Sequence, residues 1–239
     1  MSEQRTAAGM NRVIQSLWIG PRLSTMEQLC IRSFLRHGHD FHLYAYNDME
    51  NIPEGTVIKD GNEILPKSLI GAYTHVANFS DVFRYKLLSV QGGWYIDMDA
   101  ICLHRLDFPT DYVFARTRDG VSNYVMKAPA NSAIMSWCVE QSLPSSGIGM
   151  RWGDVGGRLL TAAIEKFSLR EFIQPEQVFC SIPWDTMPHA AVGKPALKLP
   201  GCAHVAHFCH EMWVREGYDR DARYPPESLY ERLKERYNA

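Results

Sequence analysis

Long hydrophobic runs are missing from this sequence of 239 residues. No stretch approaches the roughly 18 consecutive apolar residues that a transmembrane helix needs, and residues 1–6 lack the apolar core of a signal peptide. A basic excess is missing too, because 25 Lys and Arg residues face 27 Asp and Glu residues, for a net charge of −2. This balance argues against a nucleic acid as the main partner. We therefore expect a cytoplasmic protein, and peripheral association with the inner face of a membrane stays open.

Paired cysteine motifs are also missing. The six cysteines show no CxxC spacing and no disulfide rhythm, and a chain of this length can build a core without disulfides. We therefore expect reduced thiols. Because the sequence contains no internal repeat, low-complexity segment or linker, we predict one α/β domain over residues 1–239.

The first residues with a clear pattern predict a parallel sheet. Residues 13–20 are mostly apolar and end at Gly20 and Pro21, which is typical of a buried strand. Residues 24–37 have helical spacing, and residues 41–46 read as a second strand. A strand, a helix and a strand within about 35 residues form a βαβ unit. The predicted fold class is therefore α/β, with a mixed, mainly parallel sheet flanked by helices.

The rest of the chain alternates in the same way. Further strands are predicted at 56–58, 101–103, 112–115, 123–128 and 179–184, helices at 69–78, 131–141, 158–167 and 227–237, and a loop at 144–149.

The segment from Ser80 to Asp99 is the most informative. Ser80 is a plausible N-cap, and Asp81 then lies in the first turn of the helix, where the helix dipole favours an ionised carboxylate. Gly92 and Gly93 predict the end of that helix. The aromatic and β-branched residues at 94–96 predict a short buried strand that leads directly into two acids.

Asp97 and Asp99 are those acids, separated by one residue. On an extended backbone, residues i and i+2 point to the same face, so the two carboxylates would lie together. Like charges that close repel each other unless a cation or hydrogen-bond donors lie between them. Carboxylate oxygens suit Mg²⁺ or Mn²⁺. The alternative is a pair of solvated acids at the end of a strand.

Other candidates have two interpretations each. Asp81 and Arg84 are three residues apart on one predicted helix, which fits either a simple ion pair or a site for sugar hydroxyls. Trp18 follows the first strand and is either a core residue or a stacking platform, because ligands bind at the carboxyl ends of parallel strands. The segment 202–213 is rich in His and Cys but lacks two separated ligand pairs, which argues against structural zinc.

Three segments resemble one family, the DXD-containing glycosyltransferases of the GT-A fold, family 32. Residues 14–20 (IQSLWIG) resemble its opening I-x-x-x-W-I-G strand, and residues 80–99 resemble its core, S-D-x-x-R followed by G-G-x-Y-x-D-x-D. Residues 207–213 resemble its H-x-x-x-x-x-W segment more loosely. The resemblance implies a retaining hexosyltransferase of polysaccharide biosynthesis. It also implies a nucleotide-sugar donor (a UDP-sugar), a glycan or lipid-linked acceptor, and Mn²⁺ or Mg²⁺.

The resemblance also implies roles for individual residues. Trp18 and Ile19 would contact the nucleotide base, Asp81, Arg84 and Tyr85 the donor sugar, and Trp213 the phosphates. Asp97 would contact the ribose, the sugar or the metal, Asp99 would bind the Mn²⁺ that bridges the diphosphate, and Met98 would be part of the donor site. The metal ligands would be Asp97 and Asp99, completed by His207, His210 or Glu211. The chain departs from the family at Gly156-Gly157, where Gly-Pro is common, and at Glu211-Met212, where the family often has a serine.

Two alternatives belong to other function classes. A haloacid-dehalogenase-like phosphohydrolase also carries an acid pair after a strand, but it needs Thr or Val where this chain has Ile101, and its motif opens the chain. A non-catalytic sugar- or nucleotide-binding module of the same fold is the other alternative. The intact set of Asp81, Arg84, Asp97 and Asp99 argues against it.

Overall fold

The computed structural model describes residues 12–143, 154–193 and 197–239. The predicted loop at 144–149 lies outside the described residues. The strands are β1 Val13–Leu17, β2 Asp40–Ala45, β3 Thr56–Asp60, β4 Gly93–Ile96, β5 Ala100–Cys102, β6 Val113–Thr117, β7 Gly120–Ala128, β8 Ile173–Gln174 and β9 Val205–His207. The helices are α2 Thr25–Arg36, α3 Val76–Gln91, α4 Ala133–Ser142, α5 Gly157–Lys166, α6 Glu176–Phe179, α7 His189–Val192, α8 His210–Arg215 and α9 Leu229–Tyr237.

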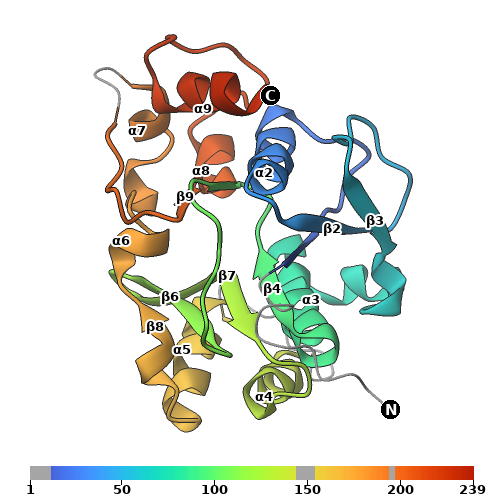
Figure 1. The fold of residues 1–239 in the computed structure, drawn as a ribbon. Coiled ribbons are helices and arrows are strands. Elements are labelled where there is room, and N and C mark those ends of the chain that lie inside the picture. The colour runs from blue at the N-terminus through green and yellow to red at the C-terminus, as the bar shows by residue number, and fades with distance from the viewer. Residues whose placement is uncertain (1–11, 144–153, 194–196) are drawn as a thin grey trace.

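Seven of these strands form one mixed sheet in the order β3-β2-β1-β4-β7-β6-β8. The pairs β3–β2, β2–β1, β1–β4 and β6–β8 are parallel, whereas β7 runs antiparallel to both β4 and β6. The prediction of a mixed, mainly parallel sheet flanked by helices is therefore confirmed. A separate two-stranded ribbon pairs β5 with β9. This ribbon lies beside α2 in Figure 1.

Side chains alternate between the two faces of the sheet, and each face has its own core. In β4, Trp94 and Ile96 join the core that includes α2, α9 and the β5–β9 ribbon, whereas Tyr95 joins the core under α3, α4 and α5. The helices α3 and α4 lie next to each other in Figure 1, which agrees with their mutual contacts. The central strand β4 is thus buried on both faces, as in parallel sheets, whereas the edge strand β3 leaves Val57 and Ile58 exposed.

The helix α3 begins earlier than the sequence pattern predicted. Its N-cap is His75, so Ser80 and Asp81 lie inside the helix rather than at its start. The reason is that the apolar helical pattern continues upstream through Phe79, which is fully buried. The C-terminal prediction is confirmed, because Gly92 caps the helix with a φ of 62°.

One predicted strand is wrong. Residues 179–184 are not a strand, because Phe179 ends the short helix α6 and residues Trp184–Thr186 form a 3₁₀ turn. The apolar run that suggested a strand is a buried helix end, since Phe179 is fully buried in the core. The six cysteines all lie in the described residues and are free, which agrees with the expected thiols. Among the described residues, no helix is long and apolar enough to cross a membrane.

Candidate active site

Asp97 and Asp99 lie on a tight turn that joins β4 to β5. The backbone N–H of Asp97 still donates to the carbonyl of Tyr124 on β7 (2.8 Å), and the N–H of Ala100 donates back to the carbonyl of Asp97 (3.2 Å). The backbone between the acids is therefore turned, not extended as predicted. Their carboxylates nevertheless converge, because the turn folds Asp99 back toward the end of β4.

Asp97 is paired with a guanidinium. Nη1 of Arg84 donates to its Oδ2 at 3.2 Å, Nη2 lies 3.1 Å from its Oδ1, and the hydroxyl of Tyr95 donates to Oδ1 at 3.2 Å. Burial raises the pKa of Asp97 to about 6; Arg84 acts against this, and the neighbouring charge of Asp99 adds to it. Burial and mutual repulsion of the two carboxylates thus disfavour their ionised forms. A cation bound between them would offset this cost.

Asp99 has different partners. The backbone N–H of His210 donates to its Oδ2 at 2.6 Å, and Nε2 of His207 lies 3.3 Å from its Oδ1. Burial alone would raise the pKa of Asp99, but His207 and the His210 amide outweigh it and hold this pKa below its ordinary value. Oδ1 is buried and accepts no well-aligned hydrogen bond from the described residues. Asp99 therefore stays ionised with one oxygen available to a ligand.

Asp97, Asp99 and His207 form a candidate metal group. One ligand atom of each lies within 4.8 Å of the others. In the part of the chain that the structure describes, this is the one such group of three or more His, Cys, Asp or Glu residues. Two carboxylates and one imidazole fit a divalent cation, and the oxygen-rich set favours Mn²⁺ or Mg²⁺. The buried Oδ1 of Asp99, which lacks a well-aligned donor, supports that fit.

Asp81 and Arg84 adjoin this group from α3. Oδ1 of Asp81 lies 3.3 Å from Nη2 of Arg84 and accepts from Nδ2 of Asn123 at 2.7 Å. Arg84 also donates to the carbonyl of Asn123 (2.9 Å) and to both the carbonyl and the hydroxyl of Ser80. Burial raises the pKa of Asp81, and Arg84 and Asn123 oppose the rise. The dipole argument for Asp81 is wrong, because α3 starts at Val76 and Asp81 lies beyond its first turn.

The other residues predicted to bind the nucleotide sugar differ in location and burial. Trp18 is half-buried after β1, and its Nε1 donates to the carbonyl of Arg22 at 3.0 Å. Ile19 is partly buried and packs against the core under α3. Tyr85 is fully buried, and its hydroxyl donates to the carbonyl of Gly156 (3.0 Å), while Met98 is 5% exposed. Tyr85 and Met98 therefore support the site from within the core.

The C-terminal candidates separate clearly. The imidazole of His207 faces the acids, whereas His210 reaches Asp99 through its backbone amide. Glu211 is exposed and pairs with Arg215 at 2.9 Å. Trp213 is fully buried among aromatic rings, with Tyr230 at 4.9 Å, and its Nε1 has no hydrogen-bond partner among the described residues, so its contact with the phosphates stays a prediction. The loose H-x-x-x-x-x-W spacing did not reveal that its last residue is a core residue.

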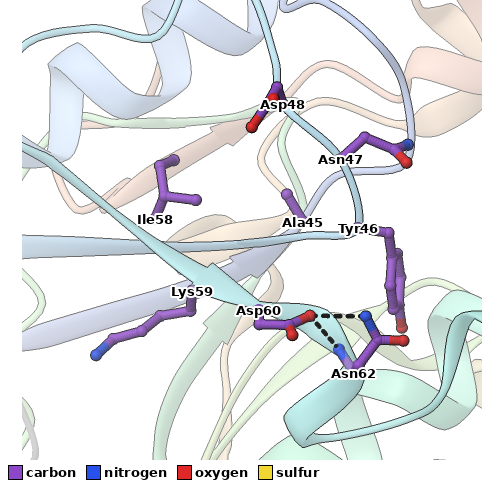
Figure 2. A pocket seen from close by; sticks show the side chains of 8 residues that line it. All are labelled: Ala45, Tyr46, Asn47, Asp48, Ile58, Lys59, Asp60 and Asn62. Carbon is purple, nitrogen blue, oxygen red and sulfur yellow. Dashed lines mark hydrogen bonds between the residues drawn. The ribbon is translucent and has the colours of Figure 1, made fainter.

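An open groove of about 430 Å³ lies at the carboxyl ends of β2 and β3. Figure 2 shows its lining side chains, with Asp60 accepting hydrogen bonds from Asn62 at one end and Asp48 at the other. None of the acids of the candidate metal group lines it. Since β1 separates β2 from β4 in the sheet, Trp18 ends the strand that lies between the groove and the acids.

Sequence reasoning missed two residues of the site, Asn123 and Tyr124. Both lie on β7 opposite the end of β4, where Asn123 binds Asp81 and Arg84 and Tyr124 stacks on His207 with ring centroids 3.8 Å apart. The strand itself was predicted, but its antiparallel pairing with β4 could not be read from a sequence separation of about 25 residues.

The comparisons with known proteins point to one family. Residues 24–117 match the family described as "Glycosyltransferase sugar-binding region containing DXD motif". The match includes α2, α3 and both acids, and it ends with β6. No curated protein matches the chain in sequence.

Several solved structures are similar at a distance. One titled "PaToxG Glycosyltransferase" is 16% identical, with a TM-score of 0.48 over 65% of this chain and 69% of the other. The apo-form glycosyltransferase GlyE of Streptococcus pneumoniae TIGR4 is 14% identical, with a TM-score of 0.49 over 82% of this chain and 54% of the other. A third, the structure of a transferase mutant, is 13% identical, with a TM-score of 0.45 over 70% of this chain and 92% of the other. This chain therefore spans about half of GlyE.

Proposed function

We propose that this chain is a metal-dependent, retaining hexosyltransferase that uses a UDP-sugar, from the premise that residues 24–117 match the family of glycosyltransferase sugar-binding regions that contain a DXD motif. Its acceptor would be a hydroxyl group of a glycan or of a lipid-linked glycan. The observation that carries the proposal is the convergence of Asp97, Asp99 and His207 within 4.8 Å, next to the buried pair of Asp81 and Arg84. Membership of family 32 is part of the proposal.

Asp97, Asp99 and His207 would hold the ion, because they supply two carboxylate oxygens and a nitrogen at one point. When bound, a divalent cation neutralises the negative charge that develops on the departing diphosphate. The low pKa of Asp99 keeps this residue ionised and ready to bind. His210 contributes its amide, which orients the carboxylate of Asp99 toward the same point.

Asp81 and Arg84 would bind the donor sugar. Asn123 and Arg84 both contact Oδ1 of Asp81. We therefore propose that Oδ2 accepts a hydrogen bond from a sugar hydroxyl group. Arg84 is held from four directions by Ser80, Asp81, Asp97 and Asn123, which fixes its guanidinium before the donor arrives. This preorganisation lowers the entropy cost of orienting the sugar.

Trp18 and Ile19 would contact the nucleotide base. Since Nε1 of Trp18 is already bonded to Arg22, the proposed contact is stacking on the indole face, not a hydrogen bond. The base would then lie between the acids and the groove of Figure 2, at the carboxyl edge of the sheet where ligands of α/β folds bind. Retention of anomeric configuration follows from the family resemblance, and NMR of the product would test it.

The experiment is a binding and turnover screen. Calorimetry with UDP-glucose, UDP-galactose, UDP-N-acetylglucosamine and GDP-mannose, each with and without Mn²⁺ or Mg²⁺, should find one UDP-sugar that binds only with the ion. Asp99→Asn should abolish both binding of the ion and sugar release, whereas the exposed control Asp119→Asn should retain them. Absence of ion-dependent binding for every donor would refute the proposal. Ion-dependent binding without sugar release or transfer would instead favour the non-catalytic module.

The phosphohydrolase alternative finds no support in the family match, because the matched residues 24–117 include the acid pair. Release of inorganic phosphate from p-nitrophenyl phosphate would revive it.

A further inference from the structure

His207 reaches the acids from an unusual setting. It ends the three-residue strand β9, where it pairs with Ala100 directly after the acid turn. The N–H of Phe208 donates to the carbonyl of Asp99 at 2.9 Å. The backbone therefore places His207 beside Asp99, but backbone pairing does not fix the rotation of an imidazole about its side-chain bonds.

Tyr124 covers one face of that imidazole. The two rings are stacked with centroids 3.8 Å apart and planes inclined by only 8°. Tyr124 is 2% exposed, so the surrounding core fixes its ring, and its hydroxyl also donates to the carbonyl of Phe179. The carbonyl of Tyr124 also accepts the N–H of Asp97 at 2.8 Å. One residue thus holds both an acid and the histidine of the candidate metal group.

Cys209 lies at the opposite ring nitrogen. Its Sγ is 3.5 Å from Nδ1 of His207 and 3.9 Å from the carbonyl oxygen of His207. The thiol can therefore donate its proton to the carbonyl while the sulfur accepts from Nδ1–H. Cys209 adopts φ 50° and ψ 63°, a left-handed conformation that non-glycine residues seldom adopt and that places the thiol beside the ring.

We propose that Tyr124 and Cys209 are positioning residues that fix the plane and the Nδ1 edge of His207, so that its Nε2 faces Asp97 and Asp99 as a metal ligand. This inference rests on the metal site of the proposed function. Metal-binding histidines generally use their second ring nitrogen in a hydrogen bond that orients the ring. Here the partner of that nitrogen is a thiol, and the stacked tyrosine supplies the second constraint.

The two residues should differ in effect. Ring stacking is the stronger interaction and sulfur is a weak hydrogen-bonding partner. Tyr124→Leu should weaken Mn²⁺ binding by about 10-fold or more, and Tyr124→Phe, which keeps the stacked ring, should stay within about 2-fold of wild type. Cys209→Ala should weaken binding by about 3-fold, and Cys209→Ser should recover part of the loss. Cys202→Ala, which removes an exposed thiol, is the matched control.

The readouts are Mn²⁺ affinity by EPR titration of the purified protein and electron spin echo modulation of bound Mn²⁺, which detects a directly bound imidazole nitrogen. Wild type should show that nitrogen, His207→Gln should lose it, and Tyr124→Leu and Cys209→Ala should reduce it while circular dichroism stays unchanged. If Tyr124→Leu does not fold, Cys209→Ala and its serine rescue decide. Unchanged affinity and nitrogen signal in Cys209→Ala and Tyr124→Leu would overturn the positioning roles alone. Wild type that binds neither Mn²⁺ nor Mg²⁺ would overturn the metal site itself.

Discussion

The two acids of the DXD motif lie in two different surroundings. The helix side consists of Ser80, Asp81, Arg84 and Asn123 around Asp97, and the strand side consists of His207 and the amide of His210 around Asp99. On the helix side, a single guanidinium donates to or pairs with all of its neighbours, including Asp97. On the strand side, Oδ1 of Asp99 is buried without a well-aligned hydrogen-bond partner among the described residues.

This difference indicates separate tasks for the two sides. A buried charge that the protein itself balances stabilises the fold and holds a shape, whereas a buried polar atom left without a donor invites a ligand. We therefore expect substitutions on the helix side to act mainly on stability. Substitutions on the strand side should act mainly on ion binding.

The largest expected effect follows from Arg84→Met. It leaves Asp81 and Asp97 buried without their cation, and breaking a buried ion pair typically lowers the free energy of unfolding by about 3–5 kcal/mol. Urea denaturation followed by circular dichroism measures the loss. Arg118→Met is the control, because Arg118 is exposed in its pair with Asp185 and should leave the unfolding midpoint unchanged. Equal midpoints for the two variants would contradict a stabilising role of the helix side.

A backbone change should come next. Gly92 connects α3 to β4 with a φ of 62°, and a Cβ atom at this position would lie 2.4 Å from the backbone nitrogen of Ala130. Gly92→Ala should therefore lower the free energy of unfolding by about 3 kcal/mol, through the strained φ and the clash together. Gly201→Ala, where a Cβ meets no atom within 4 Å, is the control. A Gly92→Ala protein as stable as the Gly201→Ala protein would show that the turn can shift freely.

Asn123→Leu tests the hydrogen bond between Asn123 and Asp81 on the helix side. It removes the 2.7 Å hydrogen bond to Asp81, and a lost hydrogen bond to a buried charged group should cost about 2 kcal/mol. A double-mutant cycle with Asp81→Asn, measured by urea denaturation, isolates the pair. Additive losses in the double mutant would mean that the two side chains do not interact energetically.

The sequence predicted the helix side far better than the strand side. Asp81, Arg84 and Asp97 lie within 17 residues of one another in the chain, and helical and strand periodicity is enough to bring them together. The error there was local: the helix starts at Val76, because the apolar pattern runs further upstream than the capping signal suggested. Sheet order and the antiparallel run of β7 depend on tertiary packing, so Asn123 and Tyr124 could not be found.

The strand side needed contacts across more than 100 residues. The sequence left His207, His210 and Glu211 as equal candidates, because their side-chain directions depend on the short strand β9 and on the left-handed Cys209. The family resemblance placed Trp213 at the phosphates, but it could not show that this residue packs in an aromatic core. A sequence shows which residues could bind a metal or a ligand, but tertiary packing determines where their side chains point.

His207→Gln should have the smallest effect on the free energy of unfolding without metal. Its effect on stabilisation by Mn²⁺ tests the strand side directly. It removes a half-buried partner of Asp99 and should cost about 1 kcal/mol without metal. With Mn²⁺ at about 100 times its Kd, the wild type should gain about 2.7 kcal/mol, and a tenfold weaker site should gain only about 1.4 kcal/mol. His210→Gln is the matched control, because it keeps the backbone amide that binds Asp99 and should retain the full gain. Urea denaturation with and without Mn²⁺ measures both gains. A loss of the gain in His210→Gln rather than in His207→Gln would move the third ligand to His210 and reverse the assignment of the strand side.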